Sequence, residues 1–430
     1  MTITGVGVTS NSSNNKSTII VKIDSGSIVK CSNGVVTKTA TEKEGQWRFN
    51  NIDNGVWTIT AIKGDAKAEE NVTVNRLDVY YIDMTYVNIF GISRDITASS
   101  PAWARTDMAV GMSAKASVGT SAGKSDFDNV MPWKGIVREN IGSDVMVKIP
   151  KFYYQRNRSG NIEHIRIADK PKSGFKVHPL FTHNSKESEC AYIGAYKTSS
   201  GNKSVSGASP QVDQTRAVMR NNAKSKGAGW SLMDVAALSA IQMLMLVEYA
   251  DNNTQQVIGR GYCEGGNSLK TGSCNKVPGL TGRPAGTDGE VDVVYRGIEG
   301  LWGNVSEWID GVNFGNDTCY VSNDSLKYSD DTTTGYAALS YKPIGVHGYI
   351  TEMGLDTGAN THIMLPVLAK GSETTGFCDR SSLEDATEWE VLSCSGAYND
   401  HSNSGLFNAS SHRSFMSYLT VGSRLLYIPS

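Results

Sequence analysis

Residues 17–87 alternate between apolar and polar side chains, and this alternation restricts the start of the chain to β-structure. The alternating stretches are STIIVKI, SIVKCSN, GQWRFNNI, GVWTITAI and LDVYYIDMTYV, and turn formers such as NNIDNG and IKGD separate them. Because a period of two places successive side chains on opposite faces, each predicted strand has one apolar face. We expect about seventy residues of such strands to fold as a small β-sandwich, and we assign residues 1–88 to it.

The stretch GQWRFNNIDNGVWTITAI, residues 45–62, predicts a hairpin with one apolar face. Asn54-Gly55 would supply the turn, and the apolar face would consist of Trp47, Phe49, Trp57, Ile59 and Ala61. The whole segment resembles the Ig-like or transthyretin-like modules that bacterial and phage surface proteins use as spacers. Such a module usually positions another domain.

The charge balance argues against two classes of partner. The 430 residues include 41 basic and 43 acidic side chains, for a formal net charge of −2. No excess of positive charge is available to neutralise nucleic acid or anionic lipid, so we expect no nucleic acid and no membrane insertion. The sequence begins MTITGVGVTS, without a visible signal peptide, so we expect synthesis in the bacterial cytoplasm.

One long apolar stretch, SLMDVAALSAIQMLMLVEYA at residues 231–250, predicts a helix. Its apolar residues lie nearly all round the helix, so it should be largely buried in a soluble protein. Ser231, with Asp234 three residues later, matches a capping box at its start. The abundance of glycine, 44 residues, otherwise favours short strands joined by turns.

Residues 96–125 are rich in Ser, Ala, Gly and Thr, and we assign residues 89–126 to a linker or long loop. Gly119-Thr-Ser121-Ala-Gly123 matches the G-x-S-x-G nucleophile elbow, and GTSAGKS is one residue short of a phosphate-binding loop. Both motifs need an apolar strand before them and a helix after them. Polar MSAKASV precedes and SDFDNV follows, so we predict neither activity.

The segment GLWGNVSEWIDG, residues 300–311, concentrates two of the eight tryptophans around an amide and a carboxylate. Glu307 could be a general acid or base that burial between Trp302 and Trp308 activates. Alternatively the tryptophans are core residues, and Asn304 and Glu307 hydrogen-bond the turns of a loop-rich domain. No His, Cys or second carboxylate lies close in sequence, so we favour the structural interpretation.

GLWGNVSEW, together with GSRLL at residues 422–426, resembles the formylglycine-generating-enzyme (sulfatase-modifying-factor) branch of the C-type lectin fold. The run from FDNVMPW through VMVKIPKFYYQ, GFKVHPLF and YIGAYK is similar to phage and prophage tail proteins with that domain. The resemblance implies a C-type lectin domain over residues 127–430. It also implies structural roles for Trp302, Asn304, Glu307, Trp308 and Arg424. The expected fold class is therefore mainly β, with an α+β C-terminal domain.

The chain departs from the enzymes of that family. They bind copper through two cysteines a few residues apart near the C-terminus, whereas Cys378 and Cys394 are sixteen positions apart. The related sulfoxide synthases use a His-x3-His-x-Glu iron site, which this sequence lacks; His178 and His183 are its nearest histidine pair. Asp330-Asp331 alone is a weak calcium signal. We therefore expect no enzyme activity, no cofactor and no catalytic metal. Whether Cys263 and Cys274 form a disulfide stays open.

The end of the chain is similar to the C-terminal variable region of diversity-generating-retroelement target proteins, and we place the variable segment at residues 395–430. Within residues 395–418, Tyr, Asn and His alternate with Ser, and Lys and Glu are absent. Antibody paratopes have this composition, because Tyr gives a large contact and Ser, Asn and Gly adapt their hydrogen bonds. The predicted ligand-facing residues are Tyr398, Asn399, His401, Asn403, Asn408, His412, Phe415 and Tyr418. Leu406, Val421, Leu425 and Leu426 should support them.

The sequence thus predicts a receptor-binding or adhesion protein of a phage tail (virion) or bacterial cell surface. Its partner would be a host or bacterial surface protein or glycan. Tail-fibre relatives are often trimers, so the resemblance implies a homotrimer, whose multivalency would add avidity. Two alternatives stay open: a formylglycine-generating-type oxidase, and a purely structural virion or pilus subunit.

Overall fold

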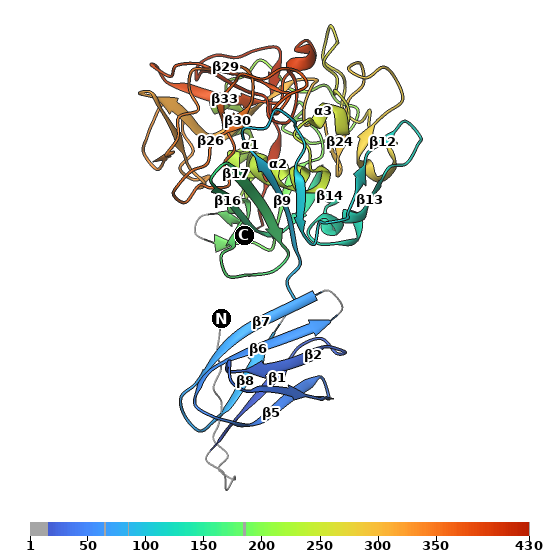
Figure 1. Cartoon of the computed structure of the whole chain (residues 1–430). Coiled ribbons are helices and arrows are strands. Elements are labelled where there is room, and N and C mark those ends of the chain that lie inside the picture. The colour runs from blue at the N-terminus through green and yellow to red at the C-terminus, as the bar shows by residue number, and fades with distance from the viewer. Residues whose placement is uncertain (1–15, 64–65, 85, 184–185, 430) are drawn as a thin grey trace. The chain divides into compact units, whose positions relative to one another are not determined.

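The computed structural model describes residues 16–63, 66–84, 86–183 and 186–429. The chain divides into two compact units, residues 1–88 and residues 89–430, and strands dominate both (Figure 1). The protein is therefore mainly β. Three α-helices occur among the described residues, all in the second unit: α1 (Arg216–Lys224), α2 (Val235–Tyr249) and α3 (Thr254–Val257). Helices of 3-10 type are η1 (Asp126–Asn129), η2 (Trp133–Gly135), η3 (Pro179–Phe181), η4 (Pro278–Leu280) and η5 (His401–Asn403).

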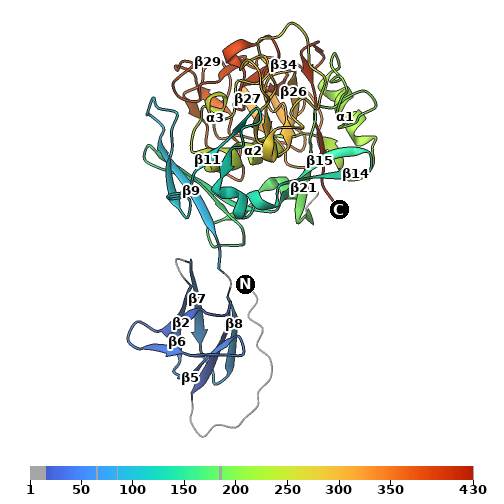
Figure 2. The ribbon, with the colours of Figure 1, turned by 90° about the vertical axis from the view of Figure 1, so that its right-hand side faces the viewer.

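The first unit is a sandwich of two four-stranded sheets that share one core (Figures 1 and 2). One sheet has the order β4-β5-β1-β8, with β1 (Ser17–Lys22), β4 (Glu42–Lys43), β5 (Gln46–Ile52) and β8 (Val79–Asp83). The other has the order β3-β2-β6-β7, with β2 (Ile28–Ser32), β3 (Thr37–Ala40), β6 (Gly55–Lys63) and β7 (Ala66–Val74). Apolar alternation thus predicted the strands of this unit.

The predicted hairpin of residues 45–62 is wrong in one respect. β5 and β6 do not pair with each other, because β5 pairs with β1 and β4, and β6 pairs with β2 and β7. The Asn54-Gly55 turn instead carries the chain from one sheet to the other. Trp47 and Trp57 are both buried in the shared core, so apolar faces that the sequence placed side by side meet across the sandwich.

Residues 89–126 belong to the second unit, so the prediction of a linker is wrong. They begin with β9 (Ile89–Asp95), whose Phe90 and Ile92 are buried in the main core. β9 lies inside a sheet of order β10-β9-β17-β16-β18. Its other strands are β10 (Ala104–Asp107), β16 (Tyr153–Ser159), β17 (Ile162–Ala168) and β18 (Lys176–Val177). The small residues that follow β9 serve turns between short paired strands.

Residues 114–125 form three of these short strands: β11 (Ala114–Lys115), β12 (Ser117–Val118) and β13 (Lys124–Ser125). Ser121 lies in a tight turn, where its N–H bonds the carbonyl of Val118 at 3.0 Å. No α-helix follows this turn, so neither the nucleophile elbow nor the phosphate loop is present. β12 pairs with β23 (Gly282–Arg283), which continues through β24 (Val294–Tyr295) to β25 (Ile298–Glu299).

The C-terminus is held inside a five-stranded sheet of order β14-β15-β21-β36-β22. Its strands are β14 (Val137–Ile141), β15 (Asp144–Pro150), β21 (Cys190–Gly194), β22 (Trp230–Leu232) and β36 (Leu425–Tyr427). Leu425 and Leu426 are fully buried there. A Cβ on Gly194 would lie 3.1 Å from the carbonyl oxygen of Tyr196 and 3.3 Å from Cγ of Arg424, so glycine permits a close approach.

The largest sheet contains the second half of the tryptophan segment and two short strands of the C-terminal segment. Its order is β28-β27-β26-β33-β34-β32-β29, and β35 pairs with β26. The strands are β26 (Ser306–Gly315), β27 (Thr318–Val321), β28 (Ala337–Ala338), β29 (Val346–Tyr349), β32 (Arg380–Leu383), β33 (Glu390–Cys394), β34 (Ala409–Arg413) and β35 (Val421–Gly422). Three two-stranded sheets also occur among the described residues of the unit: β11 with β13, β19 (Thr182–His183) with β20 (Lys186–Glu187), and β30 (Glu352–Met353) with β31 (Pro366–Leu368).

Helix α2 is buried along its whole length, as its apolar pattern predicted. The predicted capping box is wrong, because Ser231 lies within β22 and Asp234 is itself the N-cap. The carboxylate of Asp234 accepts the N–H of Ala237 at 2.8 Å, and the helix ends at Ala250 in a left-handed conformation. No helix in the described residues combines the length and the apolar character that a membrane crossing needs.

Candidate functional site

The tryptophan segment lies at the start of β26 and is buried throughout. Trp302 donates its indole N–H to the carbonyl of Gly259 at 3.0 Å, and Trp308 donates to that of Gln214 at 2.9 Å. Both indoles are 0% exposed, so each anchors a separate loop to the sheet. The segment is therefore a brace that joins β26 to distant parts of the chain.

Glu307 is locked between two buried cations. Its Oε1 lies 2.8 Å from Nζ of Lys197 and 2.6 Å from a terminal nitrogen of Arg424. Burial alone would raise the pKa of Glu307, but Arg424 and Lys197 outweigh it and hold the pKa below its usual value. A carboxylate that is permanently ionised and doubly paired cannot exchange protons near neutral pH. The geometry thus fits the structural role.

Arg424 extends the brace to the last strand of the chain. It donates to the carbonyls of Gly194 at 2.8 Å and of Glu299 at 2.8 Å, besides its pair with Glu307. Sequence reasoning assigned Arg424 correctly to the interior but missed Lys197. The only signal for Lys197 was its place directly after β21, in the YIGAYK stretch.

Asn304 connects the brace to the loop at 262–269. Its side-chain oxygen accepts the N–H of Leu269 at 2.9 Å, and its amide donates to the carbonyl of the same residue at 3.2 Å. Its backbone N–H bonds the carbonyl of Tyr262 at 2.7 Å, and its own carbonyl accepts the N–H of Tyr398 at 2.9 Å. The backbone of Asn304 therefore touches the first predicted ligand-facing residue.

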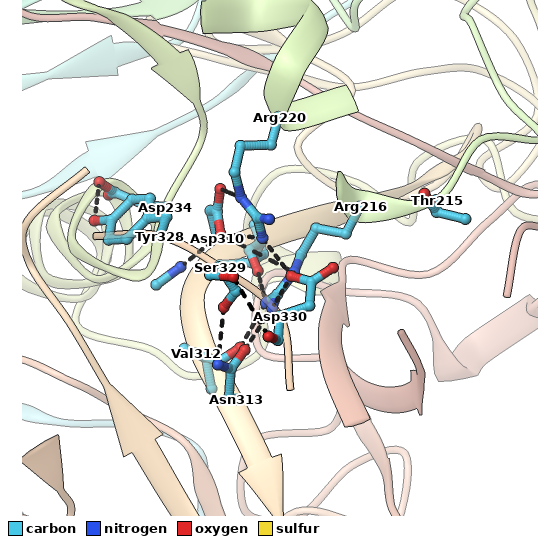
Figure 3. Close-up of polar contacts among 12 residues, drawn as sticks. Thr215, Arg216, Arg220, Asp234, Asp310, Val312, Asn313, Tyr328, Ser329 and Asp330 are labelled. Carbon is cyan, nitrogen blue, oxygen red and sulfur yellow. Dashed lines mark hydrogen bonds and ion pairs between the residues drawn. The ribbon is translucent and has the colours of Figure 1, made fainter. Parts of the chain in front are cut away.

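A second buried charge cluster joins α1 to β26 (Figure 3). Arg216 and Arg220, one turn apart on α1, reach Asp310 of β26 and Asp330 of the following loop. Arg220 bonds Asp310 at 2.6 Å, and Arg216 bonds Asp330 at 2.6 Å. Burial would raise the pKa of Asp330, but the two guanidiniums hold it below its usual value. The sequence signal that could have revealed this cluster was the i, i+4 arginine pair.

The predicted ligand-facing residues do not share one surface. Asn399, His401 and Phe415 are exposed, whereas Tyr398, Asn403, His412 and Tyr418 are only partly accessible. They fall into two groups: a polar turn, residues 398–403, before β34, and an apolar loop, residues 414–420, after it. Because β34 has five residues, it separates the groups by roughly 16 Å of strand.

The assignment of Asn408 is wrong, and the ring of His412 is largely engaged by neighbouring side chains. Asn408 is buried, and its amide donates to the carbonyls of Arg380 and Asn403, both at 3.0 Å. His412 packs edge-on against Trp308, with ring centroids 5.4 Å apart, and bonds the hydroxyl of Ser393 at 2.8 Å. Burial lowers the pKa of His412 to about 4. Asn408 lies directly before β34, and His412 lies within β34, between β33 and β32.

The apolar loop exposes large side chains from a fixed backbone. Phe415 is 74% exposed, Leu419 is 68% exposed and Met416 is 37% exposed. Ser414 donates to Asp331 at 2.7 Å and Ser417 donates to Asp213 at 2.8 Å, so the start and the middle of the loop are tied to other segments.

Tyr418 connects this loop to the tryptophan brace. Its ring lies 4.8 Å from that of His412 and 6.3 Å from that of Trp308. Of the predicted supporting residues, Leu406, Val421, Leu425 and Leu426 are all buried. The exposed apolar side chains therefore stand directly in front of a packed aromatic layer.

The polar turn is equally constrained. His401 donates its backbone N–H to the carbonyl of Cys263 at 3.0 Å, and its ring nitrogen Nδ1 lies 2.5 Å from Glu264. Gly265 donates to the carbonyl of Tyr398 at 2.6 Å. Sequence reasoning missed this contact loop, because nothing in residues 263–265 marks a partner for a segment more than 130 positions away.

The cysteine and histidine side chains that the sequence offered as metal ligands lie apart from one another in the described residues. Cys378 and Cys394 are buried, and burial raises the pKa of the Cys378 thiol to about 12. Cys263 and Cys274 are both free thiols. His178 is fully buried and bonds Ser239, while the side chain of His183 lies outside the described residues. Within the described ranges, no three His, Cys, Asp or Glu side chains gather as a metal site requires.

Comparisons with known proteins yield little. No family model matches the chain, and no curated protein matches it. Among solved structures, the chain is similar to the full-length major pilin SpaD from Corynebacterium diphtheriae, with 14% identity over 38% of this chain. The match spans 54% of the pilin, about half its length, and the TM-score is 0.14. A TM-score this low does not establish a shared fold.

Proposed function

We propose that the chain is a receptor-binding or adhesion protein of a phage tail, prophage or bacterial surface, and that it acts by non-covalent recognition. Its first unit would be an Ig-like or transthyretin-like spacer. Its second unit would be a C-type lectin domain of the formylglycine-generating-enzyme branch, presenting a diversified C-terminal segment. Motifs in GLWGNVSEW and GSRLL, and the sandwich architecture of the first unit, support these assignments.

The observation that carries the proposal is the exposure of Phe415 and Leu419 on the apolar loop. Large apolar side chains that project from a soluble surface mark interaction sites. The loop is held by Ser414, Ser417 and Tyr418, so little conformational entropy is lost when it binds. Rigid aromatic and aliphatic anchors of this kind supply most of the affinity in protein recognition.

A cell-adsorption experiment tests the proposal. The purified full chain would be incubated with a panel of bacterial strains, and bound protein would be measured by flow cytometry. Phe415→Ser combined with Leu419→Ser should weaken adsorption to the recognised strain at least about tenfold, which corresponds to about 1.4 kcal/mol. Val110→Ser is the matched control, because Val110 is 67% exposed on a different loop. Equal adsorption by both variants would refute the proposal.

The gene neighbourhood provides an independent test of the retroelement assignment. A reverse-transcriptase gene, together with a near-duplicate of the coding stretch for residues 395–430 that differs at adenines, is the expected finding. The residues that the duplicate changes should include Phe415 and exclude the buried Leu426. Substitutions concentrated at the buried positions of β36 would contradict the assignment.

The two alternatives make different predictions. A formylglycine-generating-type oxidase would need the thiolates of Cys378 or Cys394, and burial raises the pKa of both thiols. Metal analysis and a Cys394→Ser activity measurement would reveal such an enzyme, whereas recognition should survive that change. A purely structural virion or pilus subunit should assemble and attach normally after the apolar-loop substitutions.

A further inference from the structure

A polar cleft of about 300 Å³ opens beside the polar turn, at the other end of β34 from the apolar loop. Four segments of the second unit line it: α3 with its flanks, the turn at residue 288, the 373–374 turn, and η5. The lining residues are Asn253, Gln255, Gln256, Arg260, Asp288, Glu373, Thr374 and Ser402. The volume is at the lower end of the range for small-molecule sites, and it suits one or two sugar-sized rings.

The chemistry of the lining selects among ligand classes. Every lining side chain carries a polar group and none is a large apolar residue, so the cleft lacks the hydrophobic side chains that usually surround the anchor residue of a protein partner. The lining contains two carboxylates, those of Asp288 and Glu373, and one guanidinium, that of Arg260. This balance disfavours phosphate and other anions, because their charge would meet the excess carboxylate.

The two carboxylates are already engaged by the protein, which argues against a cationic ligand. Asp288 accepts the backbone N–H of Arg260 at 2.7 Å. Glu373 accepts the hydroxyls of Tyr349 at 3.1 Å and of Ser402 at 2.9 Å. A carboxylate held in this way retains free lone pairs for a hydroxyl donor. It gains less from an added cation, because its charge is already partly compensated.

The floor of the cleft is preorganised. The amide of Gln255 donates to the buried carboxylate of Asp379 at 3.2 Å and to the carbonyl of Ser402 at 3.1 Å. Asn253 is buried and caps α3 by accepting the N–H of Gln256 at 2.9 Å. Fixed donors and acceptors on a rigid floor reduce the cost of ordering side chains around a small ligand.

From this arrangement we propose that the cleft is a binding site for an uncharged, hydroxyl-rich ligand, that is, a neutral saccharide. Adjacent hydroxyls of a sugar both donate and accept hydrogen bonds, which matches the mixture of amides, carboxylates and hydroxyls in the lining. The inference rests on the proposed recognition function, but it assigns a second site that is separate from the apolar loop.

Saturation-transfer NMR and calorimetric titration of the full chain test the proposal. The probes are the neutral trisaccharides maltotriose, cellotriose, mannotriose and N,N′,N″-triacetylchitotriose, with trigalacturonic acid as the anionic arm and the glucosamine trimer as the cationic arm. Thr374→Trp places an indole at the exposed edge of the cleft. Thr333→Trp is the matched control, because Thr333 is also exposed but does not line the cleft.

At least one neutral trisaccharide should bind, and Thr374→Trp should weaken that binding at least about tenfold while Thr333→Trp leaves it unchanged. Binding of none of the neutral trisaccharides, binding only of a charged trimer, or equal binding by both tryptophan variants would overturn the inference. The apolar-loop variant separates this proposal from the first: its saccharide binding should persist even where its cell adsorption is lost.

Discussion

Replacing Glu307 by Gln tests whether the buried ion cluster braces the second unit. The substitution keeps the size of the side chain but removes the charge that faces Lys197 and Arg424, both of which are 1% exposed or less. Both short bonds, at 2.6 and 2.8 Å, end on Oε1, so the amide NH2 would replace Oε2 and point a donor at Nε of Arg424, which donates to Oε2 at 3.1 Å. Breaking a buried pair from one side costs about 3–5 kcal/mol, because an uncompensated charge remains inside.

Urea unfolding of the full chain, followed by tryptophan fluorescence, measures this loss. The buried indoles of Trp302 and Trp308 report on the second unit, and Trp47 and Trp57 report on the first. We expect the unfolding midpoint of the second unit to move to a lower urea concentration, with an unchanged m value. The shift should correspond to a loss of about 3–5 kcal/mol in the free energy of unfolding. Glu264→Gln is the control: Glu264 pairs with Arg260 at the surface, and losing such a pair costs about 1 kcal/mol or less.

The pH dependence provides a further check. Because the folded-state pKa of Glu307 is depressed, its contribution is fully present above the unfolded-state pKa and is lost as pH falls through the folded-state pKa. The Gln variant should therefore lose less stability than the wild type on acidification. A loss below about 1 kcal/mol at neutral pH, or a loss equal to that of Glu264→Gln, would refute the brace.

Three other outcomes follow from the same structure. Arg220→Met removes one guanidinium from between Asp310 and Asp330, and should cost about 3–5 kcal/mol and speed hydrogen exchange in residues 322–336. Burial raises the pKa of Asp379 to about 8, so the second unit should lose stability as pH rises from about 4 to about 8. This group contributes at most about 1.4 kcal/mol per pH unit to that loss. In urea unfolding at several pH values, Asp379→Asn should make the dependence of stability on pH less steep. Phe415→Ser should change the free energy of unfolding by no more than about 0.5 kcal/mol, because the side chain is 74% exposed. A larger loss of stability in calorimetry would mean that the residue supports the fold.

Several features of the protein could be predicted from the sequence because they depend only on the local pattern of apolar and polar residues. A period of two placed Trp47, Phe49 and Trp57 on apolar faces, and a nearly uniform apolar run made α2 a buried helix. Hydrophobic residues around GSRLL placed the last strand in the interior. Such patterns state which side of an element is buried, and the described residues agree with them.

Which strands pair and which segments pack together could not be predicted in the same way, because these contacts join residues far apart in the chain. Whether β5 pairs with β6 or faces it across a core depends on which sheet each strand joins, and both arrangements bury the same residues. Phe90 and Ile92 drew residues 89–95 into the second unit despite the loop-like composition that follows them. Local alternation contains no information on such choices.

The candidate site shows the same division. Composition alone marked residues 395–418 as a recognition segment, and it correctly singled out Phe415 and His401 as exposed. Only the tertiary structure placed Asn408 inside, where it bonds the backbone of Arg380, and packed His412 of β34 against Trp308, since β34 runs between β33 and β32. The sequence by itself determined which residue types the segment offers. The packing around β34 decided which of them reach solvent, because Ala409 and Ser411 are buried in it whereas Ser410, His412 and Arg413 are partly accessible.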